Sequence, residues 1–152
     1  YNFFSLTTIF SIIRIIRISD SIKITSALHP HPNGANSYRL EIADTVIVYC
    51  TDIEHPETHL NANAIDIAKN ADVLINDAHF TDEQLKEHKG WGHSSWQQST
   101  ALAKEANVKK LALFHHNPDH NDKTIRIIEE NAKKVFPNTI AAREGLEIIV
   151  PA

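Results

Sequence analysis

Short β-branched segments alternate with helical segments along most of this chain, and this alternation restricts the fold more than any other feature. The segments typical of strands are SIKITSAL, YRLEI, TVIVYC, VLIND and KKLALF. Helical spacing or helix-start residues mark HLNANAIDIAKNA, TDEQLKEH, HSSWQQSTALAKEA and DKTIRIIEENAKKVF, with Thr81 and either Ser94 or Ser95 as caps. A closing strand pair is predicted over 138–150, with a turn near Gly145. This order predicts an α/β domain in which helices cover a sheet.

Histidines and carboxylates collect where the predicted strands end. If these strands are parallel, four loops meet at one edge of the sheet, where α/β folds bind their ligands. Imidazole and carboxylate together suit zinc, manganese or iron. The residues concerned are His29 and His31, then Asp52, Glu54 and His55, then Asp77 and His79, and finally His115 and His116.

Each of these motifs also has a purely structural interpretation. HPHPNG contains a His-x-His pair that could chelate one ion, but it also reads as a proline-rich turn into Asn33-Gly34. TDIEH fits a turn or a helix entrance as well as a strand that delivers Asp52. His93, after two glycines, is a candidate general acid or base, or else a helix boundary. We assign Cys50, inside VIVYC, to the core.

Composition limits the partners and the compartment. The chain has 152 residues and a formal net charge of −4, which argues against nucleic-acid binding through overall positive charge. Its single cysteine cannot form an internal disulfide, so a reducing, cytoplasmic location is expected. There are 10 histidines and no methionine. The length suits one domain over 1–152.

The first 22 residues are apolar, but two arginines interrupt them. Arg14 and Arg17 leave too short an apolar run for the roughly 18 to 20 residues of a membrane span, and no membrane contact is expected. The segment also lacks the order of a signal peptide. We interpret it as a core strand or helix, or as a sticky surface through which the chain pairs into a homo-oligomer.

Four motifs occur in a familiar order: HPNGANSYRLE, then TDIEH, then LINDAHF, then GWGHSSWQQSTALAKEANVKKLALFHHNP. Over residues 23–152 the chain therefore resembles the C-terminal half of a metallo-β-lactamase-fold hydrolase. The resemblance is to the ribonuclease Z-like branch, which includes phosphodiesterases. It implies one half of an αββα sandwich, in which helices cover a sheet.

The resemblance also implies a site. His31 and His115 match metal ligands, and Asp52 matches the carboxylate that bridges both ions and takes part in catalysis. His93 matches the proton-transfer residue. The resemblance implies that the intact family site holds two divalent ions. Zinc is the expected metal, and manganese and iron are the alternatives. Neighbouring residues are candidates for orienting the ligands or contacting substrate: His116, Glu54, His55 and Asp77.

One family motif is missing. The family has a His-x-His-x-Asp-His motif in its N-terminal half, and HHNPDH misses it by one position, with Asn117 in place of histidine. The chain is thus expected to be either the C-terminal part of a longer enzyme or a shortened paralogue. Alone it would hold at best one weakly bound ion and have little activity.

The expected reaction is phosphodiester hydrolysis by a metal-activated water. Two alternatives stay open: a non-catalytic α/β binding or assembly module, and a lactonase or other ester hydrolase on the same fold. The sequence has no basic, aromatic-rich arm that would select tRNA. A small phosphodiester is therefore the expected substrate, with RNA not excluded but not favoured.

Overall fold

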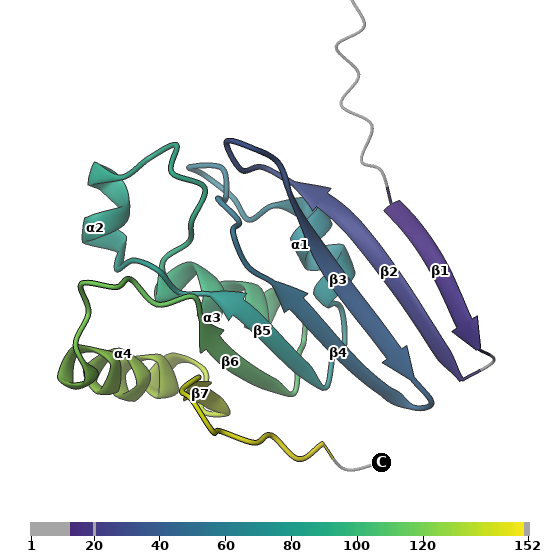
Figure 1. The fold of residues 1–152 in the computed structure, drawn as a ribbon. Coiled ribbons are helices and arrows are strands. Elements are labelled where there is room, and N and C mark those ends of the chain that lie inside the picture. The colour runs from purple at the N-terminus through teal and green to yellow at the C-terminus, as the bar shows by residue number, and fades with distance from the viewer. Residues whose placement is uncertain (1–12, 20, 151–152) are drawn as a thin grey trace, which may run out of the picture.

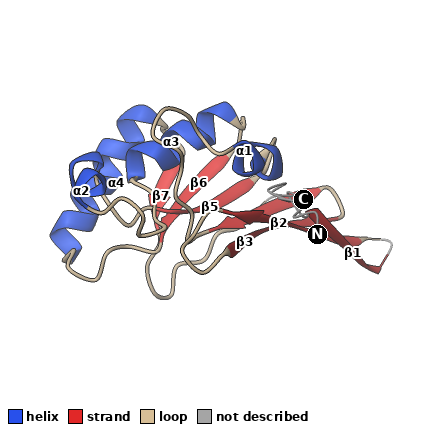
Figure 2. Cartoon of the chain, turned by 90° about the horizontal axis from the view of Figure 1, so that it is seen from above, coloured by secondary structure: helices blue, strands red, loops and turns tan. Residues whose placement is uncertain are grey.

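The computed structural model describes residues 13–19 and 21–150. These residues form one layer of helices on one face of a single sheet (Figures 1 and 2). The elements are, in chain order, β1 (Ile13–Ser19), β2 (Ile22–His29), β3 (Ala35–Ile42), β4 (Thr45–Cys50), α1 (Ala62–Ala68), β5 (Val73–Asp77), α2 (Asp82–Glu87), α3 (Trp96–Glu105), β6 (Lys110–Phe114), α4 (Asp122–Val135) and β7 (Thr139–Ala141). This architecture confirms the predicted α/β class and the half-sandwich.

The sheet has seven strands in the order of the chain, β1 to β7. Strands β1 to β4 pair antiparallel, whereas β4 to β7 pair parallel. As a result β2, β4, β5 and β6 all end at the same edge, at the upper left of Figure 1. The loops that leave this edge carry the histidines and carboxylates singled out above.

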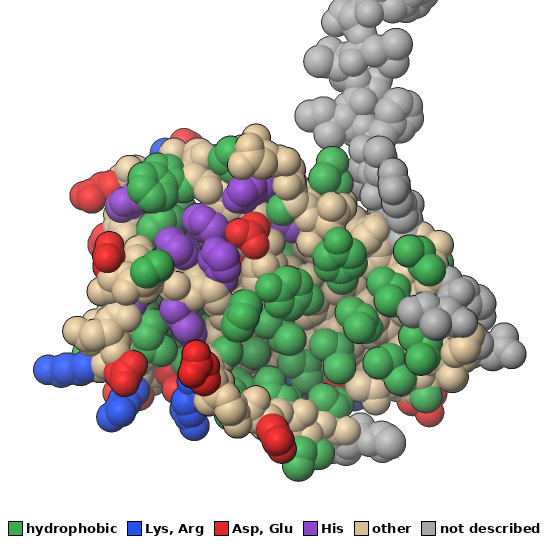
Figure 3. All heavy atoms as spheres, viewed as in Figure 1, with side chains coloured by type: hydrophobic (Ala, Val, Ile, Leu, Met, Phe, Trp, Pro, Cys, Tyr) green, Lys and Arg blue, Asp and Glu red, His purple; other side chains and the backbone are tan. Residues whose placement is uncertain are grey.

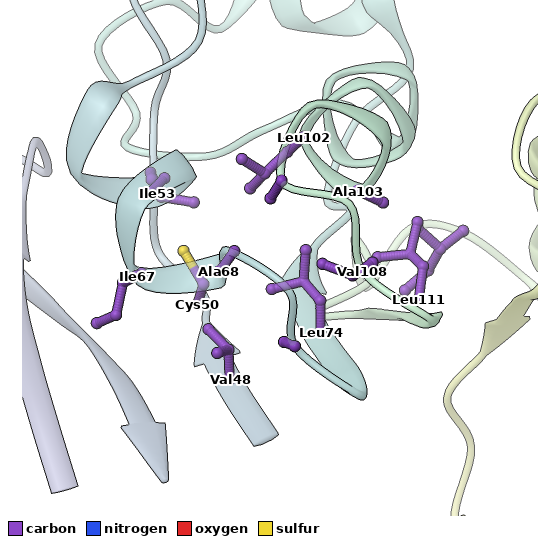
Figure 4. Packing of buried hydrophobic residues seen from close by; sticks show 14 of the residues in the cluster. Val48, Cys50, Ile53, Ile67, Ala68, Leu74, Leu102, Ala103, Val108 and Leu111 are labelled. Carbon is purple, nitrogen blue, oxygen red and sulfur yellow. The ribbon is translucent and has the colours of Figure 1, made fainter. Parts of the chain in front are cut away.

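The core lies between the sheet and the helices. Val48 and Cys50 in β4 lie on either side of the exposed Tyr49, and both are fully buried, as is Leu74 in β5 (Figure 4). They pack against Ile67 of α1 and Leu102 of α3. Burial raises the pKa of the Cys50 thiol to about 12, so this cysteine is an inert core residue, as predicted.

No helix of the described residues covers the opposite face of the sheet, which carries an aromatic patch. Tyr38 of β3 lies directly opposite Tyr49 of β4, and the Tyr49 ring contacts Phe114 of β6 edge to face, with 6.0 Å between ring centroids. All three side chains are exposed, and apolar groups spread around them over this face (Figure 3). A contiguous apolar face of this kind is typical of a surface that another element packs against.

The helices begin where the sequence places their caps. Thr81 and Ser95 each form a complete capping box, with Gln84 and Gln98 as the reciprocal partners. Ser95, and not Ser94, caps α3. The Ser94 hydroxyl instead donates to the backbone carbonyl of Ile53 at 2.5 Å, which ties the start of α3 to the loop after β4.

The predicted strand pair over 138–150 is wrong in its second half. β7 pairs with β6, but after a turn in which Leu146 N–H bonds the Arg143 carbonyl, residues 146–150 join no strand (Figure 1). Leu146, Ile148 and Val150 are half-buried between exposed neighbours. Alternating burial of this kind also arises on a segment that lies against an apolar surface, and alternation does not reveal whether a partner edge exists.

The predicted apolar start falls partly outside the described residues, since 1–12 and 20 lie outside them. The remainder includes β1, which pairs antiparallel with β2. Among the helices that the structure describes, none has the length and apolarity to cross a membrane.

Candidate metal centre

The loops at the upper-left sheet edge bring five potential ligands together, and Figure 3 shows histidine side chains gathered there. Ligand atoms of His31, Asp52 and His93 lie within 4.8 Å of one another. A second group, His79, His93 and His115, meets the same limit. His115 Nε2 lies 3.5 Å from Asp52 Oδ1, which joins the two groups. The cluster thus includes all four residues predicted as ligands or catalytic groups, and adds His79.

Asp77, at the end of β5, links the loops of the cluster and is fully buried. Its Oδ2 accepts from the Asp52 backbone N–H and from His93 Nδ1, both at 3.0 Å. Its Oδ1 accepts from the backbone N–H groups of His79, at 3.0 Å, and Ser94, at 3.3 Å. One buried carboxylate therefore fixes the positions of three loops relative to one another.

His93 is the central ring of the cluster. It stacks on His79, with centroids 4.3 Å apart, and on His115, at 4.9 Å. The hydrogen bond that His93 donates to Asp77 raises the pKa of His93 above its ordinary value, against the opposing effect of burial. Burial lowers the pKa of His79. The cluster therefore pairs one imidazole that favours its protonated form with one that favours its neutral form.

Glu54 holds the loop that carries His93. Its two carboxylate oxygens accept from the backbone N–H groups of Gly90 and Gly92, each at 2.8 Å. Gly92 has a φ of +89°, and an added Cβ there would lie 2.2 Å from His31 Cδ2. Only a glycine allows this close approach. A pocket of about 460 Å³ adjoins the contact and is lined by Pro30, His31, Pro32, Glu54, His55, Pro56 and Gly90.

Two of the cluster residues have left-handed backbone conformations. Asp52 has a φ of 57° and His115 a φ of 55°, and each lies just past the end of a strand. Residues other than glycine rarely adopt this region, and such strain concentrates at functional sites. The structure therefore holds these two side chains in place at a cost in backbone energy.

The remaining predicted neighbours have structural contacts. His116 Nε2 is 3.2 Å from the Ala142 carbonyl, so this ring ties the loop after β6 to the end of β7. His55 is buried, and its Nδ1 accepts from the Asn61 N–H at 3.0 Å, just before α1. Neither residue belongs to the two groups whose ligand atoms lie within 4.8 Å of one another. Glu54 and Asp77 orient the cluster from outside it.

His55 makes the folded protein sensitive to acid. Burial lowers the pKa of His55 from 6.5 to about 4, so the folded state keeps this ring neutral where the unfolded chain binds a proton. Between pH 6.5 and about 4 the unfolded state holds more protons, and the free energy of unfolding falls as the pH falls, by on the order of 3 kcal/mol. We expect His55→Asn, which keeps an acceptor for Asn61, to make the pH dependence of the free energy of unfolding shallower.

Urea unfolding in EDTA at several pH values tests this, with His59→Asn as the matched control because His59 is exposed. An unchanged pH dependence in His55→Asn would show that other groups cause it.

His79 is the cluster residue that sequence reasoning did not assign. The sequence placed it at a strand end, but its spacing from His93 and His115 along the chain gives no sign of contact. Its position two residues after Asp77, at the end of a buried strand, was the available signal.

Comparisons with known proteins agree with this fold. The beta-lactamase superfamily domain matches residues 10–116. The ribonuclease Z of Archaeoglobus fulgidus is 42% identical over 90 residues, which are 57% of this chain and 28% of that protein. The ribonuclease Z of Lactobacillus acidophilus is 29% identical over 137 residues, 79% of this chain and 44% of that protein. The chain thus spans less than half the length of these curated relatives.

Solved structures show the same fold. The metallo-beta-lactamase fold protein YhfI from Bacillus subtilis has a TM-score of 0.71 at 23% identity, over 88% of this chain and 51% of that one. The short form of human tRNase Z has a TM-score of 0.68 at 17% identity, over 92% of this chain and 46% of that one. With the domain match over more than half of its residues, the chain belongs to the beta-lactamase superfamily, as a ribonuclease Z-like protein of metallo-β-lactamase fold.

Proposed function

We propose that this chain supplies one half of the active site of a metal-dependent phosphodiesterase that cleaves RNA. The observation that carries the proposal is the cluster of His31, Asp52, His93 and His115 at the sheet edge, with Asp77 behind it. Superfamily membership implies a divalent metal ion, typically zinc. The mixed imidazole and carboxylate donors fit zinc, manganese or iron.

His31, Asp52 and His115 are the residues that would hold metal. A bound divalent ion would polarise a phosphoryl oxygen and supply hydroxide near neutral pH. Contacts within the chain orient two of these residues. Asp77 anchors the Asp52 backbone, and the Gly92 contact packs against the His31 ring. Such orienting contacts strengthen metal binding.

His93 would donate a proton to the leaving oxygen of the phosphodiester. Its Nδ1 bonds Asp77 at 3.0 Å, so its Nε2 is the atom free to act. The hydrogen bond to this carboxylate raises the pKa of His93, which favours its protonated form. Asp77 thereby orients the ring and stabilises its positive charge.

The rest of the site would come from a second half. The 152 residues contain no His-x-His-x-Asp-His motif, which completes the ligand set in the family that the chain resembles. The face around Tyr38, Tyr49 and Phe114 is the surface on which a second sheet would pack to complete an αββα sandwich. We accordingly treat residues 23–152 as one half of a domain.

RNA becomes the favoured substrate, which reverses the preference expected from the sequence. That preference rested on the negative net charge and on the missing basic arm. The curated relatives named ribonuclease Z, at 42% and 38% identity, support RNA instead. A substrate-binding arm need not lie on the half that holds the catalytic cluster.

The test uses the complete gene product that contains these residues, loaded with Zn²⁺ or Mn²⁺. We expect metal-dependent cleavage of RNA and of bis(p-nitrophenyl) phosphate, and a kcat roughly 10² to 10⁴-fold lower in His93→Gln, the usual range for loss of a general acid. His59→Gln, at an exposed histidine, is the control and should stay within about twofold of the unmodified protein.

Absence of metal-dependent cleavage of both substrates would refute the proposal. Hydrolysis of a lactone in place of either phosphodiester would reassign the chain to an ester hydrolase. Equal kcat values for His93→Gln and the unmodified protein would remove His93 from proton transfer.

A further inference from the structure

We propose that His79, His93 and His115 form an all-imidazole site that holds one transition-metal ion by means of this chain alone. The three rings come from three loops, after β5, before α3 and after β6. One nitrogen of each lies within 4.8 Å of the others. This group contains no carboxylate and does not use His31 or Asp52, so it is an alternative to the ligand set of the proposed function.

Two of the three rings, those of His79 and His93, already have the hydrogen-bond pattern of metal ligands. His79 Nδ1 lies 3.0 Å from the His115 carbonyl, and since a carbonyl only accepts, Nδ1 carries the proton. The lone pair of the neutral ring is then on Nε2. His93 Nδ1 likewise bonds the Asp77 carboxylate at 3.0 Å. A ligating histidine almost always donates its other ring N–H to a backbone carbonyl or a carboxylate.

The rings need only a small movement to bind an ion. Two imidazole nitrogens on a tetrahedral zinc ion are roughly 3.3 Å apart, given Zn–N distances near 2.0 Å. The present separations are at most 4.8 Å. The His79 ring is also packed edge-on against the buried Phe80, with centroids 4.6 Å apart. The site is therefore close to its metal-bound geometry, with one ring already held.

The donor type selects the ion. Three imidazoles suit Zn²⁺, Cu²⁺, Ni²⁺ or Co²⁺, whereas Mn²⁺ and Mg²⁺ prefer carboxylate and water. The group with Asp52 should therefore take Mn²⁺ more readily than the three histidines do. An ion on the three histidines would occupy His93 Nε2. If the proposed function holds, that ion removes the proton donor, and excess zinc inhibits cleavage that Mn²⁺ supports.

The test measures Zn²⁺ affinity of the purified chain by competition with a chromophoric chelator. We expect His79→Gln to weaken binding at least about tenfold, the lower end of the range for a lost metal-site contact. His31→Gln and the exposed control His59→Gln should change it by less than about threefold. Because the readout is affinity, the result does not depend on whether the protein cleaves RNA.

A second measurement uses the unmodified chain and so does not depend on the folding of a variant. Long-range ¹H–¹⁵N spectra should show Zn²⁺ shifting Nε2 of His79, His93 and His115, with the His31 ring unmoved. Weaker binding in His31→Gln but not in His79→Gln would overturn this inference and favour the ligand set of the proposed function. Equal weakening in both variants, or no stoichiometric zinc, would also overturn it.

Discussion

Replacing Asp77 by asparagine is expected to lower phosphodiester cleavage about a thousandfold, within the range for loss of acid–base catalysis, while the protein stays folded. The substitution preserves volume but puts an NH₂ group near the position of Oδ2, which accepts from the Asp52 N–H and from His93 Nδ1. The Asp52 N–H and the His93 Nδ1–H would then both point at the NH₂ group, which cannot accept a hydrogen bond from either. His93 must turn or change tautomer, and its Nε2 is no longer the free proton carrier.

The effect on stability should be smaller than the effect on catalysis. A buried donor left without a partner costs about 1 to 3 kcal/mol, and Asp77→Asn can keep the two contacts of Oδ1 by choosing its amide orientation. Asp77→Ala loses all four contacts and should unfold at a lower urea concentration than Asp77→Asn. Asp66→Asn, which removes one exposed carboxylate in α1, is the matched control.

Kinetics, urea unfolding and the ¹⁵N shifts of the His93 ring together check this prediction. A normal rate combined with an unchanged His93 tautomer in Asp77→Asn would mean that the carboxylate is only a structural link between loops.

Replacing Gly92 by alanine is expected to lower Mn²⁺ affinity at the His31–Asp52 group by about 10 to 100-fold, the range seen when orienting contacts are lost. The added Cβ would lie 2.2 Å from His31 Cδ2 and 2.7 Å from Pro32 Cδ. Either His31 moves or the loop leaves its two hydrogen bonds to Glu54. A ligand displaced by about 1 Å also costs roughly a hundredfold in rate.

Gly90→Ala is the control that separates the steric clash with His31 from the backbone strain of an alanine in a left-handed conformation. Gly90 has a φ of +82°, close to that of Gly92, but an added Cβ there would meet nothing within 4 Å. Both variants should lose about 1 to 2 kcal/mol of stability from the left-handed conformation. Only Gly92→Ala should lose Mn²⁺ binding, which electron paramagnetic resonance of free Mn²⁺ measures. Equal Mn²⁺ affinities in the two variants would contradict the role given to the Gly92 contact.

Both predictions rest on contacts between loops that are far apart in the sequence. Asp77 reaches Asp52 and His93, and Glu54 reaches Gly90 and Gly92 across more than 30 positions of the chain. The Phe80–Ser95 bridge and the Ser94 hydroxyl add further links. The candidate ligands are therefore positioned mainly by their supporting loops, and loss of one supporting contact should displace several of them.

Most of the element order could be predicted from the sequence, because local patterns report local structure. TVIVYC and VLIND are strands over the predicted residues, and Thr81 caps α2. The prediction failed over 146–150. There Leu146, Ile148 and Val150 have the alternation of a strand, but a strand also needs an unpaired edge beside it, which no local pattern supplies.

For the candidate site, the sequence predicted the candidate ligands but not the roles of the residues around them. His31, Asp52, His93 and His115 could be singled out because they follow strands or a glycine loop and match an ordered set of motifs. No local pattern distinguishes Glu54, which accepts hydrogen bonds from the glycine loop, from His116, which contacts the residue after β7. Both are polar residues beside candidate ligands, and their roles depend on which loop lies opposite.

By itself, the sequence determined the α/β class, the order of strands and helices, and the strand ends that carry the candidate ligands. These features depend on periodicity and on residue type within a few positions. Only the tertiary structure decided that His79 joins His93 and His115, that Asp77 holds three loops, and that Gly92 must have no side chain. Those outcomes depend on distances across the sheet edge, which arise from packing between segments that the chain does not bring together locally.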